Sequence, residues 1–578
     1  MCTAEPEPVG LMRRDRVGGC PSWRGRQAVR RFGLAAAMCM ALGVVPGVAT
    51  AGPTAGDGSQ PALLAYDRGA DYEVFSTDIG VPVRDGQALR CSLYRPGRGG
   101  SPAEGRFPGI VMDFVPYRLM QDHAFSQSAT WFAARGYVVL MCSVRGTGGS
   151  PGTWTPFSAQ EQRDNVDLIE WLAAQPFSTG KVGQTGESYG GINSYRAAAA
   201  RPPHLVAIAP VISWKSPFDE IWYKGGIRST VFRGWPFVTW GLATPEQSPA
   251  ALASMAERAA AYETEANAHP THDAYWQAQD VDIAAVDRSN VAVLGIGGWG
   301  DFFPKGMVDN YRGARDQSWL LMFPHAHAEL APGLPGFPPE LDRARLAWFD
   351  RWLAGRADAP PPASKVTSWE MPRDGGRWRQ LPDLPDRPAG EVLQLTGTGA
   401  LAADSGPPTR LTYTVNPFDT SCACSDRGFY SPPAIATDQQ AADRSRVHFD
   451  TGPLAAPVVV AGNPEVRLRI ALSAADTNLV AHLEDVGPDG RAILMTSAWL
   501  RASFRESDVS PAPLEPGHPY DITLRLWPTH WRVPAGHGLR LSITSGDLNS
   551  IEPNAPPGTV TLLVGAGRST LTVPTSAS

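Results

Sequence analysis

One short segment, GESYG at residues 186–190, constrains the fold of this chain more than any other. It follows the G-x-S-x-G pattern of a sharp strand-to-helix turn, in which a serine stands above the edge of a sheet. The backbone of such a turn is strained, and a Cβ at either glycine would collide with the neighbouring strand or helix. Residues 181–185 before it are expected to form a short strand, and residues 193–200 after it a helix. This context predicts that Ser188 is a nucleophile.

Two later loops supply the other residues that a serine nucleophile requires. The apolar run 291–296 ends in the glycine-rich GGWG, so Asp301 is expected just past the C-terminal end of a strand. The next apolar run, 319–323, is followed by His325 and His327. The C-terminal ends of parallel strands meet at one edge of a sheet, where open α/β sheets carry their sites. The order Ser, Asp, His along the chain is the order found in α/β-hydrolases.

Each of these residues also has an ordinary structural interpretation. An aspartate after a strand is commonly a helix N-cap, and an isolated histidine is commonly a polar surface residue. Their occurrence together with Ser188, in the right order and at strand ends, favours a catalytic triad. Asp309 and Asp316 are weaker candidates for the carboxylate because both lie beyond the strand end, in the following helix or loop.

The N-terminus has the features of an export signal. Four arginines between residues 24 and 31 precede an apolar stretch at 32–48, and ATA at 49–51 fits a cleavage site. Residues 1–51 are therefore predicted to be a signal peptide, and residues 52–70 a flexible leader. A transmembrane anchor is disfavoured because the apolar run is short and interrupted. The protein is thus expected to be secreted or extracytoplasmic, without a stable membrane span.

Composition limits the partners and the cysteine chemistry. The chain has 578 residues, 43% of them hydrophobic, and a formal charge of −6, so two or three domains are expected and nucleic acid is disfavoured as a partner. Outside the predicted signal lie Cys91, Cys142, Cys422 and Cys424, an even number that permits disulfides in an exported protein. The simplest interpretation is two buried thiols and an exposed loop pair. The spacing of the cysteines and histidines does not favour a metal site.

The first part of the chain alternates strand and helix patterns, which predicts βαβ units and a mostly parallel sheet. We assign it to a catalytic α/β-hydrolase domain at 71–367. Residues 212–288 interrupt the rhythm with helical stretches such as 249–266 and are predicted to form an inserted helical cap. Residues 341–353 are expected to form the closing helix of the domain, since their apolar side chains share one face and Gly355 follows.

The second part, residues 368–578, has a different pattern. Apolar and polar residues alternate at 466–472, 522–526 and 539–543, and turn sequences separate these runs. Period-two alternation with frequent turns predicts an all-β sandwich of the jelly-roll type. The expected fold is therefore an α/β-hydrolase fold with an inserted helical cap, followed by a C-terminal all-β jelly-roll domain.

Seven short segments extend from the first part into the second: VRDG at 83–86, VRGTGGS at 144–150, the turn at 186–191, WGD at 299–301, PDGRA at 488–492, LEPG at 514–517 and LWPT at 526–529. In this order they resemble one family, the cocaine-esterase-like or CocE/NonD hydrolases. That family is related to bacterial Xaa-Pro dipeptidyl-peptidases and to α-amino-acid ester hydrolases. The resemblance runs from about Glu73 to the C-terminus.

The resemblance implies roles for particular residues. Ser188 resembles the nucleophile, Asp301 the orienting carboxylate, and His327 the base, because the family histidine follows the proline of the last strand by a few positions. The oxyanion hole of the family pairs the backbone N–H after the nucleophile, here that of Tyr189, with a tyrosine hydroxyl, here that of Tyr117. A packing role for Tyr117 is the alternative.

The sequence also departs from the family pattern. Ser143 and Arg118 stand where the family commonly has aspartate, and Cys422 and Cys424 stand where a glycine-rich linker is usual. Neither of the first two departures affects the triad, although either one can alter the pocket.

The expected activity is that of a secreted serine hydrolase that cleaves acyl esters or amides through an acyl-enzyme, without a metal or organic cofactor. Phe302 and Phe303, with Trp299, resemble an acyl pocket for neutral, apolar or aromatic groups. The alternatives are a dipeptidyl-peptidase of the Xaa-Pro type or a β-lactam acylase, for which Asp219 or Glu220 could hold a substrate amino group. A non-catalytic secreted binding protein is a more remote alternative. The sequence leaves the oligomeric state open.

Overall fold

The computed structural model describes residues 60–230, 234–243, 248–372, 374–384, 390–420 and 438–576. The predicted signal peptide, the first part of the predicted leader, and Cys422 and Cys424 lie outside these residues. Within the described ranges, no helix is both long and apolar enough to cross a membrane.

The first large sheet contains eleven strands among the described residues, in the order β1-β2-β5-β4-β6-β7-β10-β11-β12-β13, with β3 paired to β2. Its centre, from β5 to β12, is parallel, whereas β1, β2 and β13 pair in antiparallel fashion with their neighbours. The strands are β1 (Glu73–Pro82), β2 (Ala88–Arg98), β3 (Ser101–Pro102), β4 (Phe107–Met112), β5 (Val138–Cys142), β6 (Ser178–Glu187), β7 (Leu205–Val211), β10 (Ala292–Gly300), β11 (Ser318–Ala326), β12 (Val366–Glu370) and β13 (Arg377–Leu381).

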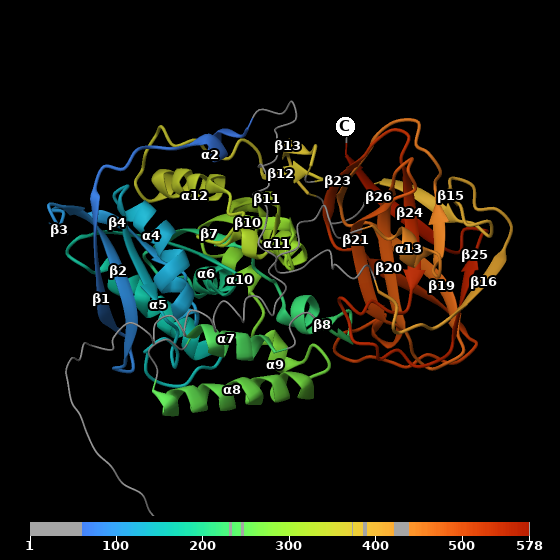
Figure 1. Ribbon diagram of the computed structural model, residues 1–578, viewed down its shortest axis with the longest axis horizontal. Helices are drawn as coiled ribbons and strands as arrows, with labels where there is room; N and C mark the ends of the chain where they lie inside the picture. Colours follow the sequence, from blue (N-terminus) through green and yellow to red (C-terminus); the bar gives the residue numbers. More distant parts are fainter. Residues whose placement is uncertain are drawn as a thin grey trace, which may run out of the picture. The chain divides into compact units, whose positions relative to one another are not determined.

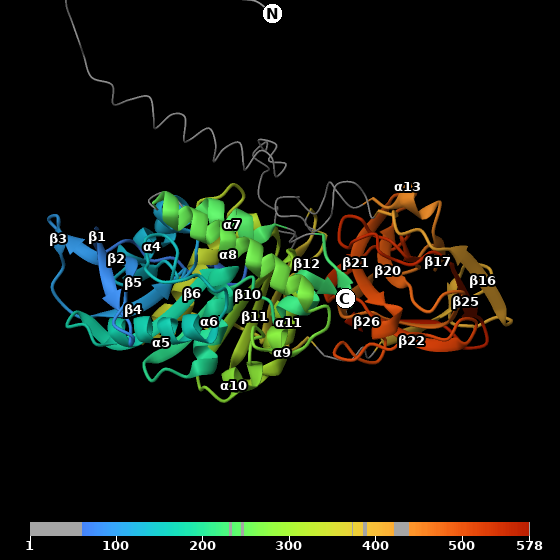
Figure 2. The same cartoon turned by 90° about the horizontal axis from the view of Figure 1, so that it is seen from below.

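The central strands are apolar runs because helices cover the sheet. Figure 2 shows α5, α6 and α10 along one side of it, and α12 packs against β7 and α4 against β5. The main apolar core lies between these layers. The helical segments that cover or follow the sheet are α3 (Arg118–Met120), η1 (Gln121–Phe125), α4 (Ser126–Ala133), α5 (Ala159–Ala173), α6 (Tyr189–Ala200), α11 (Pro304–Gly313), η3 (Arg315–Gln317), η4 (Ala328–Leu330) and α12 (Pro339–Trp352).

The stretch between β7 and β10 is mainly helical in its described residues and includes the long helix expected at 249–266, which extends to Ala268 (Figure 1). It also contains a small hairpin that the sequence did not suggest. The Arg228 backbone carbonyl in this hairpin accepts a hydrogen bond from the Glu552 backbone N–H, which ties the stretch to the β-rich part of the chain. The elements are η2 (Phe218–Trp222), β8 (Tyr223–Lys224), β9 (Ile227–Arg228), α7 (Trp235–Ala243), α8 (Pro249–Ala268), α9 (Ala274–Gln277) and α10 (Ile283–Asp287).

The C-terminal part is β-rich, with a nine-stranded and a four-stranded sheet in its described residues (Figure 1). The alternation expected at 466–472 is visible in β19, where buried and more exposed side chains alternate. The strands and short helices are β14 (Gly390–Leu395), β15 (Leu401–Ala402), β16 (Thr409–Thr414), α13 (Gln440–Asp443), β17 (Val447–Asp450), β18 (Val458–Gly462), β19 (Glu465–Leu472), β20 (Asn478–Val486), β21 (Ala492–Arg501), η5 (Ala502–Phe504), β22 (Pro519–Arg525), β23 (Thr529–Val533), β24 (Gly538–Thr544), β25 (Thr559–Val564) and β26 (Thr570–Ser576).

The boundary expected at 367/368 cuts through β12, which belongs to the first sheet. β12 pairs with β11 in parallel and with β13 in antiparallel fashion, so that sheet continues to Leu381. The change in sequence pattern marks the end of the βαβ rhythm, but local pattern cannot tell which sheet the next hairpin joins.

The described end of the predicted flexible leader is packed rather than loose. It forms α2 (Ala62–Ala65), which lies against α12 and buries Leu63 and Leu64. Just after it, the Arg68 guanidinium donates to Asp350 Oδ2 at 2.6 Å. Two buried leucines and the bonds to Asp350 thus anchor a segment whose overall composition suggested a linker.

Cys91 and Cys142 form a disulfide and are not free thiols. The two residues are direct partners in the antiparallel pair of β2 and β5, and their Cα atoms lie 4.0 Å apart. They are 51 positions apart in the sequence, so only the pairing of the strands brings them together.

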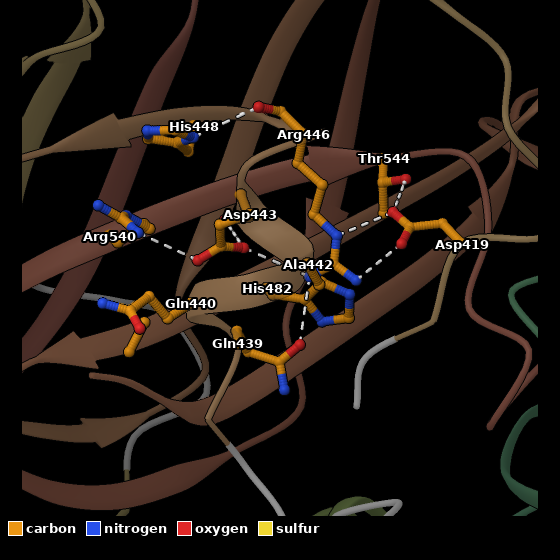
Figure 3. A network of polar contacts seen from close by, with 12 residues as sticks. Asp419, Gln439, Gln440, Ala442, Asp443, Arg446, His448, His482, Arg540 and Thr544 are labelled. Carbon is orange, nitrogen blue, oxygen red and sulfur yellow. Dashed lines mark hydrogen bonds and ion pairs between the residues drawn. The ribbon is translucent and has the colours of Figure 1, made fainter. Parts of the chain in front are cut away.

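A buried polar network lies in the β-rich part, around Arg446 (Figure 3). The fully buried Arg446 guanidinium donates to both carboxylate oxygens of Asp419, at 2.8 and 3.1 Å, and lies 3.4 Å from Asp443. The Thr544 hydroxyl also donates to Asp419, at 2.6 Å. Asp443 accepts a further hydrogen bond from Arg540. The charges inside this network therefore compensate one another.

Candidate active site

The turn at 186–190 has the strained geometry that its sequence predicted. Ser188 follows β6 and precedes α6, with φ 55° and ψ −110°. Residues other than glycine adopt such a positive φ only under strong constraint. A Cβ added at Gly186 would lie 2.8 Å from Asp113 Oδ1, and one added at Gly190 would lie 3.1 Å from the same atom. A side chain at 186 would therefore force the turn or Asp113 to move, and one at 190 would be tightly crowded. The half-buried Ser188 is held at the end of the strand.

The buried ionisable side chains of Asp113, Glu187 and Arg345 hold the turn in place. The Glu187 backbone N–H donates to Asp113 Oδ1 at 3.1 Å, and the Glu187 carboxylate binds the Arg345 guanidinium at 2.8 Å. Burial, together with the neighbouring Glu187, raises the pKa of Asp113 well above its usual value. Sequence analysis missed Asp113 and Arg345, because both contacts cross between elements that are distant in the chain.

Asp301 and His327 lie at the same sheet edge as Ser188 and are hydrogen-bonded to each other. β7 pairs with β6 and β10, and β10 pairs with β11 so that Gly300 is opposite Ala326. Asp301 follows Gly300 and His327 follows Ala326, so the two residues leave neighbouring strands side by side. Asp301 Oδ1 lies 2.5 Å from His327 Nδ1. Asp301 Oδ2 accepts the backbone N–H of Phe303 at 3.1 Å.

The bond to Asp301 orients the imidazole of His327. A proton on Nδ1 is held by the carboxylate, so the other ring nitrogen, Nε2, is left as the basic one. Asp301 is fully buried and is not the N-cap of α11, which is Phe303. His325 lies inside β11, against the ring of Phe323. Of the two histidines, the structure thus brings His327 to Asp301. Asp309 pairs with Lys305 on α11, and Asp316 lies in η3, away from this edge of the strands.

The two residues of the expected oxyanion hole lie next to each other. The rings of Tyr117 and Tyr189 meet edge to face, with their centroids 6.0 Å apart. Tyr189 is the first residue of α6, so its backbone N–H has no acceptor within the helix. Burial raises the pKa of Tyr117 to about 12, so its hydroxyl stays protonated and can donate a hydrogen bond.

An aromatic wall connects the serine turn to the histidine. Tyr189 stacks on Phe157 at 4.1 Å, Phe157 contacts Trp214 at 4.6 Å, and Trp214 contacts Phe303 at 5.9 Å between ring centroids. Phe302 and Phe303 both lie against the His327 ring, at 4.9 and 5.6 Å. These two phenylalanines therefore flank the histidine, a contact that the sequence analysis did not predict when it assigned them to the acyl pocket.

Trp299 does not belong to this wall and must be removed from the expected acyl pocket. Its indole N–H donates to Ser368 Oγ and to the carbonyl of Trp369, both at 3.1 Å, and its ring packs in the second apolar core. Trp299 lies on β10, and its indole is held by residues of β12 instead of facing the histidine. Proximity in sequence to Asp301 was therefore misleading.

Asp219 and Glu220, the candidate partners of a substrate amino group, are engaged within the protein. Asp219 lies 3.0 Å from Lys305 Nζ, which is also 3.0 Å from Asp309. Glu220 Oε1 accepts the backbone N–H groups of Lys215 and Ser216, and burial raises the pKa of Glu220 to about 8.

Comparisons with known proteins identify relatives of both parts of the chain. The family model described as X-Pro dipeptidyl-peptidase (S15 family) matches residues 85–329, which include Ser188, Asp301 and His327. The model described as X-Pro dipeptidyl-peptidase C-terminal non-catalytic domain matches residues 362–572. A cocaine esterase from Rhodococcus sp. is 28% identical over 552 residues, covering 85% of this chain and 94% of the relative. A putative Xaa-Pro dipeptidyl-peptidase from Streptomyces avermitilis is 24% identical, covering 77% of this chain and 72% of the relative.

Solved structures share the fold. A CocE/NonD family hydrolase from Staphylococcus aureus superposes with a TM-score of 0.70 at 17% identity, over 93% of this chain and all of the other. An α-amino acid ester hydrolase superposes with a TM-score of 0.71 at 20% identity, over 91% of this chain and all of the other.

Fold and relatives together define a serine hydrolase with an α/β-hydrolase-like fold and a C-terminal β-rich domain. Within that class, the chain carries both domains of the X-Pro dipeptidyl-peptidase (S15 family) models and resembles the CocE/NonD, or cocaine-esterase-like, hydrolases.

Proposed function

We propose that the protein hydrolyses acyl esters or amides through an acyl-enzyme on Ser188. His327 takes the serine proton through Nε2, and Asp301 holds the imidazole in the required tautomer. The Tyr189 N–H and the Tyr117 hydroxyl stabilise the oxyanion, and water then releases the acyl group. The observation that carries the proposal is the hydrogen bond between Asp301 and His327 at the sheet edge where the strained turn presents Ser188.

We further propose that the substrates carry neutral, apolar or aromatic acyl groups. The rings of Phe302 and Phe303 beside His327 suit an apolar acyl group. A substrate ammonium needs a carboxylate partner, since burying an unpaired charge is costly. Asp219 already pairs with Lys305, and Glu220 binds two backbone N–H groups, so neither offers that partner. Dipeptidyl-peptidase activity is the second candidate, on the strength of the Xaa-Pro dipeptidyl-peptidase relatives.

Two substrates that differ only in the amino group test this preference. The kcat/KM of the purified enzyme is compared for a phenylacetyl ester and the matching phenylglycyl ester with the same leaving group. We expect a higher value for the phenylacetyl ester, and no cleavage of an Ala-Pro amide at a comparable rate. A tenfold preference for the amino-bearing ester or the amide would overturn the proposal in favour of the second candidate. A fluorophosphonate should label wild type once, at Ser188, by peptide mass mapping, and should not label Ser188→Ala.

Residues 212–288 are proposed to act as a cap over this site and the β-rich part to be a jelly roll, as the sequence pattern suggested. Export is also a proposal. The Cys91–Cys142 disulfide supports it, because disulfides persist mainly in oxidising compartments. N-terminal sequencing of protein from the culture medium should start near Gly52, and a start near Met1 would contradict cleavage of a signal.

A further inference from the structure

The Tyr117 hydroxyl has a hydrogen-bond donor that sequence analysis did not anticipate. Trp235, the first residue of α7, donates its indole N–H to Tyr117 Oη at 3.2 Å. The two residues are 118 positions apart and lie on different elements, since Tyr117 immediately precedes α3. Both side chains are half-buried.

Packing fixes the direction of this indole N–H. The Trp235 ring is nearly parallel to those of Phe157 and Tyr189, at interplanar angles of 17° and 24°. Tyr262 meets it at 62°, with the centroids 6.1 Å apart. A ring held from several sides cannot rotate freely, so packing in the aromatic cluster keeps the N–H pointed at Tyr117.

The bond has a chemical consequence for the tyrosine hydroxyl. A phenol carries one proton to donate and an oxygen that accepts. The indole N–H occupies one lone pair of Oη, so the hydroxyl proton points away from Trp235. Thr239 of the same helix is a second polar neighbour of this hydroxyl. Chains of hydrogen bonds also polarise one another, so a phenol that accepts a bond becomes a stronger donor. Both effects favour donation toward a developing oxyanion.

We propose that Trp235 is a positioning residue for the reaction: its indole N–H holds and polarises the Tyr117 hydroxyl, so that α7 completes the oxyanion hole. This inference rests on the proposed function, in which Tyr117 donates to the oxyanion. The competing interpretation is that Trp235 only lines an apolar pocket for the substrate.

A double-mutant cycle with a p-nitrophenyl ester separates these interpretations. Trp235→Phe keeps an aromatic ring and removes the N–H. We expect it to lower kcat by about 3- to 10-fold, the worth of one neutral hydrogen bond, with KM within about twofold. In the Tyr117→Phe background, Trp235→Phe should cause no further loss of kcat. The matched control is Trp240→Phe on the same helix, whose indole donates to the Leu252 carbonyl and which should leave kcat within about twofold.

The outcomes distinguish the inference from the proposed function. Tyr117→Phe alone should lower kcat by about 10²–10³-fold. If it does, and Trp235→Phe raises KM without changing kcat or lowers kcat equally in both backgrounds, Trp235 only lines the pocket and the inference is wrong. If Tyr117→Phe leaves kcat unchanged, the oxyanion role of Tyr117 fails, and the inference falls with it. Circular dichroism and urea unfolding confirm that each variant is folded before its rates are compared.

Discussion

The edge of the first sheet and the Arg446 network of the β-rich part both bury carboxylates, but they give those carboxylates different partners. Asp419 is held by both arms of an arginine, which stays charged at any pH that the protein survives. Asp301 is held by a histidine and a backbone N–H. Only histidine changes its charge near neutral pH. The sheet edge therefore pairs its buried carboxylate with a residue type that can exchange a proton. The Arg446 network pairs its carboxylates with arginine, so its role is structural.

The histidines of the two regions make the same point. In the β-rich part, His482 Nδ1 lies 2.9 Å from Ser497 Oγ, and His530 Nδ1 lies 2.9 Å from Ser368 Oγ. Burial lowers the pKa of His482 to about 4 and that of His530 to about 3, so both stay neutral at physiological pH. A buried histidine beside a hydroxyl is thus a fixed polar link, whereas His327 lies beside a carboxylate that orients its ring.

The strongest test of this contrast is the loss of activity at the sheet edge. Ser188→Ala and His327→Ala should each lower kcat by about 10⁴–10⁶-fold, and the double variant should lose little more, because triad members act as a unit. The urea midpoint of each variant should stay close to that of wild type. Steady-state kinetics with a p-nitrophenyl ester measures the loss. The matched control is His325→Ala, and an inactive His325→Ala beside an active His327→Ala would reverse the assignment of the base.

The opposite result is expected in the β-rich part. Arg446→Met leaves Asp419 buried without its arginine and removes one of the two arginines that contact Asp443, which should lower the free energy of unfolding by about 3–5 kcal/mol. The kcat of the folded fraction should not change. Urea unfolding followed by fluorescence gives the stability. Arg410→Met, the same substitution at an exposed position of β16, should change it by less than about 0.5 kcal/mol. Equal effects of the two substitutions would show that the network contributes no stability.

A smaller effect is expected from Glu220, a buried carboxyl bound by backbone N–H groups instead of an arginine. Burial raises its pKa to about 8, so the folded state keeps a proton that the unfolded state releases above about pH 4.5. The stability contributed by this group is therefore present at low pH and is lost as the pH rises toward 8. Glu220→Gln should gain about 1–3 kcal/mol relative to wild type between pH 5 and pH 9. Glu257→Gln on the exposed side of α8 should show no such change, and a constant difference for Glu220→Gln would contradict the shift.

Much of the fold was predictable because the local patterns were strong. The apolar runs at 291–296 and 319–323 became β10 and β11, and the helix at 249–266 became α8. The strain of the turn at Ser188 followed from its two glycines. The position of Asp301 and His327 at one edge followed from the strand ends, since parallel neighbours finish on the same side.

The sequence-based predictions that were wrong share one cause. Each concerned a contact between residues that are distant in the chain. Trp299 lies two residues before Asp301, but its indole N–H bonds Ser368 of β12 and its ring does not line the site. Cys91 and Cys142 were interpreted as thiols because nothing near either residue indicates the pairing of β2 with β5. No local signal in the sequence predicted that Arg68, just after α2, bonds Asp350.

The sequence by itself therefore determined the order of elements, the strained turn and the residue types at the ends of the central strands, because these depend on interactions between near neighbours. The tertiary structure alone decided that Phe157 and Trp214 join the aromatic wall, and that a tryptophan from α7 bonds Tyr117. It also decided that Lys305 occupies Asp219. The physical reason is that side-chain direction and strand pairing are set by packing across the whole molecule, where burial outweighs local preference.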